Sequence, residues 1–204
     1  MDAIVLSRRD IKEHDQIISV LTKDQGKLDL YARGVKKIVS KNTAHLEPFS
    51  VVDIDIAAGK EFGYVTRVQS IEYFVNIRND LEKSMAASYV VSLVDRLTQE
   101  GERDVRLYAM LFDWLQHISE VEDFLFFLID CYIVVLLYCL GFSIAESNEN
   151  KRDLLFFREI EHGNWDRAIE LSREEKQRFH RKIHAFLAYH TEKKHVDWLK
   201  TCII

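Results

Sequence analysis

Residues Gly26–Ser50, GKLDLYARGVKKIVSKNTAHLEPFS, decide the fold that the sequence predicts. The stretch opens with alternating residues, and a period of two is typical of a β-strand with one buried face. The residues expected to face the core are Leu28, Leu30 and Ala32. Those expected to face solvent are Lys27, Tyr31 and Arg33. The basic segment Val35–Asn42 has no strand or helix period and is expected to be a loop, and Leu46–Phe49 forms a proline corner after it.

Four further segments of the first eighty residues have strand character. They are Ala3–Arg8, Asp15–Thr22, Leu46–Ala57 and Tyr64–Phe74. The alternation of the last segment slips near Ser70, which predicts a β-bulge. Closing five short strands into a barrel removes their exposed edges, so a five-stranded OB-fold is the leading prediction. An SH3-like barrel and a small sandwich remain as alternatives.

From Asp80 onward the apolar residues follow a helical period. Asp80 is expected to cap a helix whose apolar stripe recurs every fourth residue. That stripe is Leu81, Met85, Tyr89, Leu93 and Leu97. A second amphipathic helix is expected over Val105–Ile118. Ser172 and Glu175 have capping-box spacing before a helix through Phe179–Leu187, whereas Leu154–Ile160 is ambiguous.

These patterns predict an α+β protein. We expect an OB-fold barrel at residues 1–78 and an all-helical domain at residues 79–204, with a last short helix over His195–Ile203. The boundary between the two domains is expected near Val75–Asp80, where the period of the apolar residues changes.

The apolar segment Phe124–Phe142 approaches the length of a membrane span. Asp130 lies near its middle, where a carboxylate costs about 3 kcal/mol in a bilayer. We therefore predict a central helix buried by other helices, and no membrane association. The three widely spaced cysteines are Cys131, Cys139 and Cys202. They are expected to be reduced thiols in a cytoplasmic protein without a signal peptide.

Charge is divided unevenly along the chain. The net charge is −5, yet residues 1–80 hold 12 basic and 12 acidic residues and are neutral. Thr22–Asn42 contains six basic residues against two acidic ones. A cationic groove with aromatic rings is typical of single-strand binders. We predict a DNA-binding surface, with Tyr64 as a second ring candidate, formed by Arg8, Arg9, Lys12, Lys27, Tyr31, Arg33, Lys36, Lys37 and Lys41. The alternative is a solvated loop whose lysines only keep the protein soluble.

Motifs for catalysis are absent from the sequence. It contains no Gly-x-Gly-x-x-Gly, no phosphate-binding Gly-Lys-Ser/Thr loop and no Gly-x-Ser-x-Gly. We predict that the protein is not an enzyme and has no cofactor.

His180 and His184 have the spacing of metal ligands on a helix. Neither a cysteine nor a third histidine lies within a local motif, and the neighbouring cations disfavour a metal. Those cations are Arg178, Arg181 and Lys182. We interpret the pair as two half-exposed histidines beside an apolar stripe, and predict no metal.

The sequence resembles the bacterial RecO family of recombination mediators over residues 3–142. The resemblance is carried by AIVLSRRDIKEHDQIISVLTKDQGKLDLYARGVKK at Ala3–Lys37 and by the Leu-Glu-Pro-Phe corner. It continues through MAASYVVSLVDRLTQEGE at Met85–Glu102 and the end of the central helix at Leu140-Gly141-Phe142. The resemblance implies an OB-fold followed by a helical domain.

The resemblance also implies a function and partners. It implies binding to single- and double-stranded DNA, strand annealing, and loading of recombinase onto DNA covered by single-strand binding protein. The implied protein partners are that binding protein and RecR. Lys36, Lys37 and Lys41 match the positions at which the family binds DNA. Two other functions remain open: a protein-interaction adaptor that works through its helical half, and an RNA-binding OB protein.

Two departures from the family's pattern matter. Many members carry a four-cysteine zinc site after the Leu-Gly of the central helix, where this chain reads SIAESNENKRDLL. We therefore predict no zinc. Members also often place arginine on the approach to that Leu-Gly, where the acidic tail of single-strand binding protein docks. Here Asp130 and Cys131 stand there, and an aspartate would repel such a tail.

Overall fold

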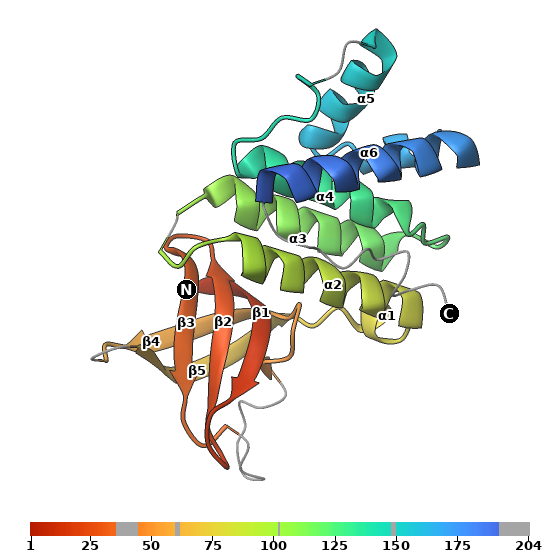
Figure 1. Cartoon of the computed structure of the whole chain (residues 1–204). Helices are drawn as coiled ribbons and strands as arrows, with labels where there is room; N and C mark the ends of the chain where they lie inside the picture. Colours follow the sequence, from red (N-terminus) through yellow and green to blue (C-terminus); the bar gives the residue numbers. More distant parts are fainter. Residues whose placement is uncertain (36–44, 60–61, 102, 148–149, 192–204) are drawn as a thin grey trace.

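The computed structural model describes residues 1–35, 45–59, 62–101, 103–147 and 150–191 (Figure 1). Its first part contains five strands: β1 (Asp2–Asp10), β2 (Gln16–Thr22), β3 (Gly26–Ala32), β4 (Val51–Ala57) and β5 (Gly63–Glu72). They close into a barrel in the order β1-β2-β3-β5-β4. The β3–β5 pairing is parallel and the other four are antiparallel. This is an OB-fold barrel, as the sequence predicts.

The predicted bulge in the last strand is confirmed. Val51 pairs with Glu72 and Val52 pairs with Ser70, so Ile71 is the extra residue on β5. The same strand begins at Gly63, where β3 and β5 approach closely. A Cβ atom at Gly63 would lie 3.2 Å from Cδ2 of Leu30 on β3 and 2.6 Å from Cγ2 of Ile56 on β4, which explains the need for glycine between these two strands.

Helices form the second part of the chain. They are α1 (Val75–Arg78), α2 (Leu81–Leu97), α3 (Val105–Glu120), α4 (Phe127–Cys139), α5 (Lys151–Glu161), the 3₁₀ turn η2 (Trp165–Ala168) and α6 (Arg173–Thr191). Beside the barrel lies α2, and α3, α4 and α6 follow in successive layers (Figure 1). The ambiguous segment 154–160 lies within α5, and the helix predicted over His195–Ile203 lies outside the described residues.

Side-chain caps fix the starts of several helices. The carboxylate of Asp80 accepts a hydrogen bond from the backbone N–H of Lys83 at 3.1 Å, as predicted for the start of α2. The predicted capping box of α6 is also present. The Oγ of Ser172 accepts from the N–H of Glu175 at 3.3 Å, and the Glu175 carboxylate accepts from the N–H of Ser172 at 3.0 Å.

The buried face of α2 differs from the predicted stripe. Leu81 is 75% exposed, and Leu93 is the one member of the stripe that is fully buried. The face that packs inward is instead built mainly of small residues: Ala86, Ala87, Val90, Val91 and Val94. Small side chains let a helix approach the barrel closely. The sequence prediction followed the large apolar residues and therefore missed this buried face.

Two apolar cores share strand β1. Ala3 and Val5 point into the barrel, where they pack with residues such as Ile18. Ile4 and Leu6 point the other way and belong to the core of the helices. Because β1 is buried on both faces, its sequence is a continuous apolar run instead of an alternating one.

A carboxylate on α2 joins the helices to the barrel. Asp95 accepts hydrogen bonds from Ser7 Oγ at 2.8 Å and Ser19 Oγ at 2.7 Å, and it forms an ion pair with Lys27 Nζ at 2.8 Å. Burial of Asp95 favours the neutral acid. The bonds from Lys27 and the two serines outweigh this effect, so the pKa of Asp95 is lowered.

The proline corner forms a second joint. Arg78 of α1 lies over the ring of Phe49, with its guanidinium carbon 4.1 Å from the ring centroid, and donates to the carbonyl of Pro48 at 3.0 Å. Phe49 has a left-handed φ of 55°, which is unfavourable for a bulky residue. Its ring is 4% exposed, and this burial together with the Arg78 contact offsets the strain.

Helix α4 is the central helix that the sequence predicts. Every residue from Phe127 to Leu137 is buried, and α3, α5 and α6 pack around it. The indole N–H of Trp114 donates to the carbonyl of Leu128 at 3.0 Å. Among the described helices, we find none with the length and apolar character needed to cross a membrane.

Replacing Asp95 with Ala should destabilise the protein by about 2–4 kcal/mol. The change removes the acceptor of two serine hydroxyls and leaves the ammonium of Lys27, whose side chain is 14% exposed, without its carboxylate. Urea unfolding measures the loss. Asp113→Ala, at an exposed position of α3, is the matched control and should change stability by no more than about 0.5 kcal/mol. Equal losses in the two variants would contradict the role of the joint.

The same joint should make stability depend on pH. Because the folded pKa of Asp95 is lowered, its contribution is fully present above the ordinary unfolded value of about 3.9 and is lost as pH falls through the folded value. We expect the stability difference between the wild type and Asp95→Asn to shrink as pH falls below about 4. A difference that is constant from about pH 7 to pH 3 would show that ionisation of Asp95 does not stabilise the fold.

Candidate nucleic-acid interface

Two tyrosine rings lie together where the barrel closes. Tyr31 of β3 and Tyr64 of β5 are register partners in the parallel pairing. Their ring centroids are 5.4 Å apart, with the planes tilted by 54°. Tyr64 is 43% exposed and Tyr31 is partly exposed. Gly59, after β4, lies against the ring of Tyr64, because a Cβ atom at Gly59 would lie 2.5 Å from that ring.

Asp15 holds Tyr31 in place. The Tyr31 hydroxyl donates to one carboxylate oxygen of Asp15 at 2.6 Å, and the backbone N–H of Gly34 donates to the other at 2.7 Å. These two bonds tie the end of the β1–β2 loop to the end of β3. The bond from Tyr31, and then that from Gly34, lowers the pKa of Asp15. The same bond raises the pKa of Tyr31.

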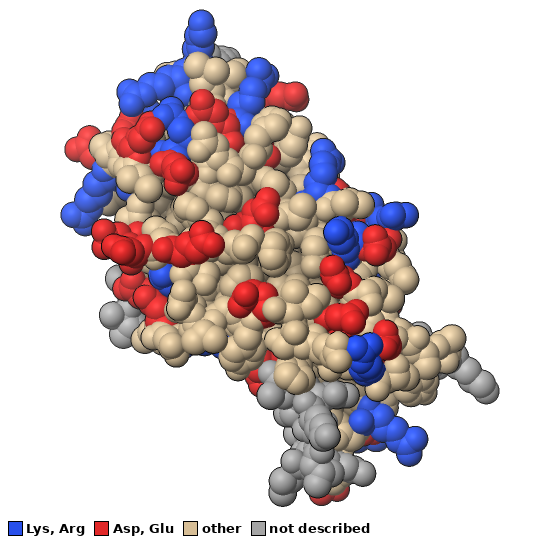
Figure 2. All heavy atoms as spheres, turned by 180° about the vertical axis from the view of Figure 1, so that it is seen from behind, with Lys and Arg blue, Asp and Glu red and all other residues tan. Residues whose placement is uncertain are grey.

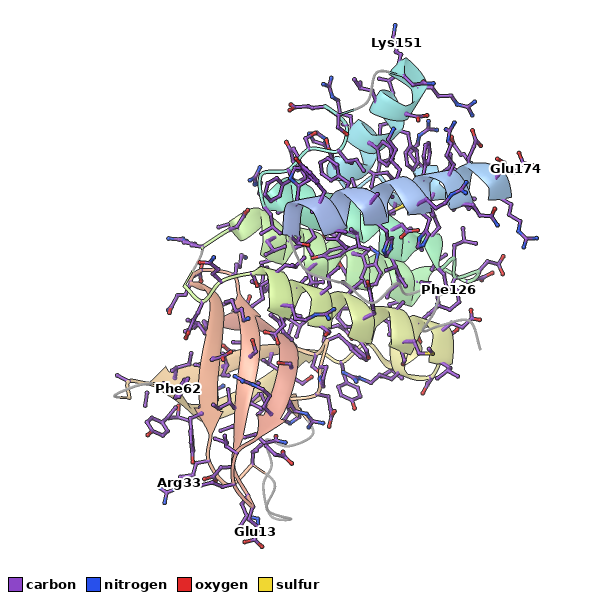
Figure 3. The ribbon with its side chains drawn as sticks, in the orientation of Figure 1. Glu13, Arg33, Phe62, Phe126, Lys151 and Glu174 are labelled. Atoms are coloured by element: carbon purple, nitrogen blue, oxygen red, sulfur yellow. The ribbon has the colours of Figure 1, made fainter. Side chains whose placement is uncertain are left out.

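Two exposed cations lie beside this aromatic pair. Lys12 in the β1–β2 loop and Arg33 after β3 are both exposed, and the positive charge of each further lowers the pKa of Asp15. Figure 3 shows Arg33 and Glu13 at the end of the barrel that is farthest from the helices. We call Tyr31, Tyr64, Lys12 and Arg33 the barrel-end surface.

Other predicted cations are paired with acidic groups on the barrel. Arg8 forms an ion pair with Glu47 at 2.7 Å, and its side chain is 26% exposed. Arg9 pairs with Asp29 at 2.9 Å but keeps 64% of its side chain exposed. Arg9 therefore remains accessible to a ligand, whereas Arg8 is largely enclosed.

The predicted orientation of Lys27 is corrected by the structure. Its position alternates outward from the barrel, but α2 covers that side, and Lys27 is enclosed in the joint with Asp95. Outward from a strand is thus not the same as exposed to solvent. Three further predicted residues lie outside the described part of the chain: Lys36, Lys37 and Lys41.

Charge on the opposite face is mixed. In Figure 2, acidic and basic side chains are interleaved, with large uncharged areas between them. The net charge of −5 therefore does not describe any one surface, and the local arrangement decides what a polyanion meets.

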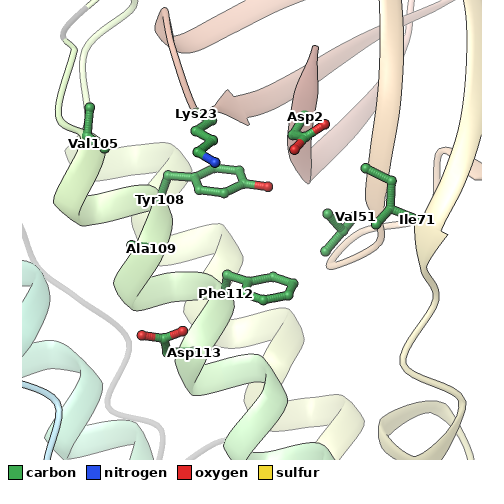
Figure 4. A pocket seen from close by; sticks show the side chains of 9 residues that line it. All are labelled: Asp2, Lys23, Val51, Ile71, Val105, Tyr108, Ala109, Phe112 and Asp113. Atoms are coloured by element: carbon green, nitrogen blue, oxygen red, sulfur yellow. The ribbon is translucent and has the colours of Figure 1, made fainter.

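A pocket of about 270 Å³ lies between the barrel and α3 (Figure 4). Its walls include Val51 and Ile71 of the barrel, with Tyr108 and Phe112 of α3 opposite. Burial, followed by the negative charges of Asp2 and Asp24, raises the pKa of Tyr108 to about 12, so its hydroxyl stays protonated at neutral pH. The pocket is thus a crevice between the barrel and α3, and none of the residues of the barrel-end surface line it.

The segment after α4 does not suit the four-cysteine zinc site found in many members of the resembling family. Ser143 Oγ and the N–H of Ala145 both donate to the carboxylate of Glu161, at 2.8 Å and 3.1 Å. These hydrogen bonds shape the turn with oxygen and nitrogen groups, and its sequence has no thiolate to offer.

Asp130 and Cys131 are both buried, at 0% and 1% exposure. The resemblance implies docking of an acidic tail at this position, where an aspartate is expected to repel it. The structure corrects the premise, because Asp130 points into the helical core and does not line a surface that a tail could touch.

Comparison with known proteins identifies relatives of both parts of the chain. The family model described as "Recombination protein O N terminal" matches residues 1–74, and "Recombination protein O C terminal" matches residues 78–150. A protein named "DNA repair protein RecO" from Pelotomaculum thermopropionicum is 36% identical over 115 residues, which is 56% of this chain and 45% of the relative.

Two further relatives carry the same name. The one from Thermoanaerobacter sp. is 31% identical over 141 residues, covering 69% of this chain and 57% of the relative. The one from Leuconostoc mesenteroides is 35% identical over 123 residues, covering 59% of this chain and 48% of the relative. The chain spans about half the length of the curated relatives that it matches.

Tyr31→Phe should raise the pKa of Asp15 toward its ordinary value. The variant keeps the ring but removes the hydrogen bond that is the main cause of the lowered pKa. An NMR titration of the Asp15 carboxyl carbon measures the change. Tyr64→Phe removes the neighbouring hydroxyl instead and should leave this pKa as in the wild type. If both variants gave the wild-type pKa, the bond from Tyr31 would not be what controls Asp15.

Proposed function

Because the chain belongs to the RecO family, we propose that it is a DNA-repair protein that binds single-stranded DNA at the barrel-end surface. The observation that carries this proposal is the pairing of Tyr31 with Tyr64 beside exposed Lys12 and Arg33. Such a surface offers rings for bases and cations for phosphates, the two elements of sequence-independent single-strand binding.

Each group has a distinct task in this proposal. The exposed ring of Tyr64 stacks on a base, with Tyr31 behind it as a support held by Asp15. Lys12, Arg33 and the exposed part of Arg9 contact phosphates. The helices do not cover this end of the barrel, so a strand can reach the surface without moving them (Figure 3).

Stacking on tyrosine also supports a role in annealing. A ring contacts the face of a base and leaves its Watson–Crick edge free. A strand held in this way can therefore pair with a complementary strand while still bound. Contacts to phosphates alone extend the proposal to double-stranded DNA, because they carry no sequence information.

We propose the protein partners from family membership. They are single-strand binding protein and RecR, with the outcome that recombinase is loaded onto a strand covered by the binding protein. This role requires binding and no chemical step, so we propose that the chain is not an enzyme. The burial of Asp130 supports the proposal, since it removes the one acidic group that the sequence placed against the tail of the binding protein.

A titration with single-stranded DNA at several salt concentrations tests the surface. Three phosphate contacts, from Lys12, Arg33 and Arg9, give a slope of about −2 in a plot of log affinity against log salt concentration, and contacts from Lys36, Lys37 and Lys41 would steepen it to about −4. Tyr64→Ala should weaken binding by about 1–3 kcal/mol at every salt concentration with the slope unchanged. The double variant Lys12→Ala/Arg33→Ala should instead make the slope less steep by about 1.4, because two cations are lost.

Three controls test whether these effects are specific to the ring of Tyr64, to the cations of the barrel end and to DNA. Tyr64→Phe retains the ring and should bind like the wild type. Arg181→Ala removes an exposed cation of α6, remote from the barrel end, and should leave affinity and slope unchanged. RNA oligonucleotides of the same length test the RNA alternative. Wild-type affinity in both Tyr64→Ala and the double variant would show that DNA binds elsewhere, and a slope near zero would exclude an electrostatic contribution.

A further inference from the structure

Asp130 is a carboxylate at the centre of the helical core. It lies in the first turn of α4, is 0% exposed, and belongs to a helix whose residues from Phe127 to Leu137 are all buried. A carboxylate at such a depth is costly unless other groups compensate its charge. The groups that face it come from α6, which is separated from it by about fifty residues of sequence.

Two histidines of α6 converge on this carboxylate. The Nδ1 atom of His180 lies 2.9 Å and 3.0 Å from the two oxygens of Asp130, and the Nε2 atom of His184 lies 3.2 Å from one of them. The rings are one helical turn apart, with centroids separated by 4.3 Å. The three potential ligand atoms all lie within 4.8 Å of one another.

This arrangement has the chemistry of a transition-metal site. Two imidazole nitrogens and one carboxylate oxygen are ligands that Zn²⁺ accepts at about 2.0–2.2 Å. Tetrahedral ligands at that distance are separated by about 3.3 Å, close to the spacing between the histidine nitrogens and Asp130. In a metal-bound state, each coordinating nitrogen would present its lone pair to the metal, and the ring proton would reside on the other nitrogen.

We propose that Asp130, His180 and His184 bind one divalent transition-metal ion, with Zn²⁺ the best fit. Exposure of the three side chains rises from 0% for Asp130 to 7% for His180 and 15% for His184. The site is therefore most open on the side of His184, where water would supply the fourth ligand. The proposal does not depend on DNA binding, because the site lies in the helices and not at the barrel end.

Of the three cations next to these histidines on α6, Arg181 is exposed to solvent, and the other two are directed toward α5. Arg178 pairs with Asp153 of α5 at 2.9 Å, and Lys182 lies 3.8 Å from the same carboxylate. Both positive charges are thus drawn to one carboxylate at the α5–α6 contact. The argument from sequence that neighbouring cations exclude a metal loses its force, because the side chains of a helix point in different directions.

His180 is buried, which differs from the half-exposed position that the sequence predicts. His184 keeps more of its side chain accessible, at 15% against 7% for His180. The sequence prediction of no metal considered ligands within a local motif, whereas the third ligand here is supplied by a different helix. The metal would link α4 to α6 and so stabilise the packing of the last described helix.

Zinc titration of the untagged, chelator-treated full chain tests the proposal, with competition against a colorimetric chelator as the readout. We expect one site, and a melting temperature that rises with Zn²⁺ concentration. His184→Ala should weaken binding by at least about 100-fold and abolish the rise in melting temperature. His162→Ala removes an exposed histidine of the α5 C-terminus and is the matched control, expected to bind like the wild type.

Cobalt substitution provides a second measurement that does not require a variant to fold. Co²⁺ in the wild type should give the visible absorption of a four-coordinate site and lack the intense near-ultraviolet band of thiolate ligation. A thiolate band would assign the metal to cysteine and overturn the proposal. It would also be overturned by the absence of Zn²⁺ binding, or by equal affinity in the wild type and a folded His184→Ala variant, and the cluster would then be a hydrogen-bonded core contact alone.

Discussion

The arrangement of the whole molecule depends on the polar joint at Asp95. A barrel and a helical layer can pack through apolar contacts in many neighbouring positions, because apolar contacts have little directionality. Asp95 removes this freedom by accepting from Ser7 and Ser19 on two different strands while pairing with Lys27 on a third. Three partners on three strands define both the position and the rotation of α2 on the barrel.

The joint also decides which end of the barrel can bind a ligand. Because α2 covers the outer side of β1 and β2, the apolar residues Ile4, Leu6 and Leu21 are buried there and Lys27 is enclosed. The helices leave free the barrel end at Arg33, two residues after Tyr31 (Figure 3). Lys27 therefore serves to hold α2 on the barrel and cannot bind a polyanion. The exposed cations Lys12 and Arg33 remain available for that purpose.

Local sequence patterns predicted the strands, helices and caps well. The predictions that failed depended on tertiary contacts between elements distant in sequence. The alternation in β3, the bulge near Ser70, the cap at Asp80 and the capping box of α6 each depend on residues close in sequence. The face of α2, the enclosure of Lys27 and the meeting of His180 with Asp130 depend on which element lies opposite. A period identifies a face of an element, but it cannot tell whether solvent or another helix covers that face.

The role of Asp15, which contacts Tyr31 of the barrel-end surface, is also explained by its tertiary contacts. Asp15 repels phosphate, and it would be a poor residue for this place if charge alone mattered. Its two oxygens are instead used to hold Tyr31 and Gly34, so the ring that supports Tyr64 is fixed before a base arrives. Arg9 is likewise paired with Asp29 in the free protein, so a phosphate that binds Arg9 competes with a carboxylate. The acidic residues therefore fix the side chains of this surface in place, but they weaken its electrostatic attraction for phosphate. Binding of single-stranded DNA to this surface should therefore depend more on preorganised stacking, and less on net charge, than binding to a lysine-rich loop would.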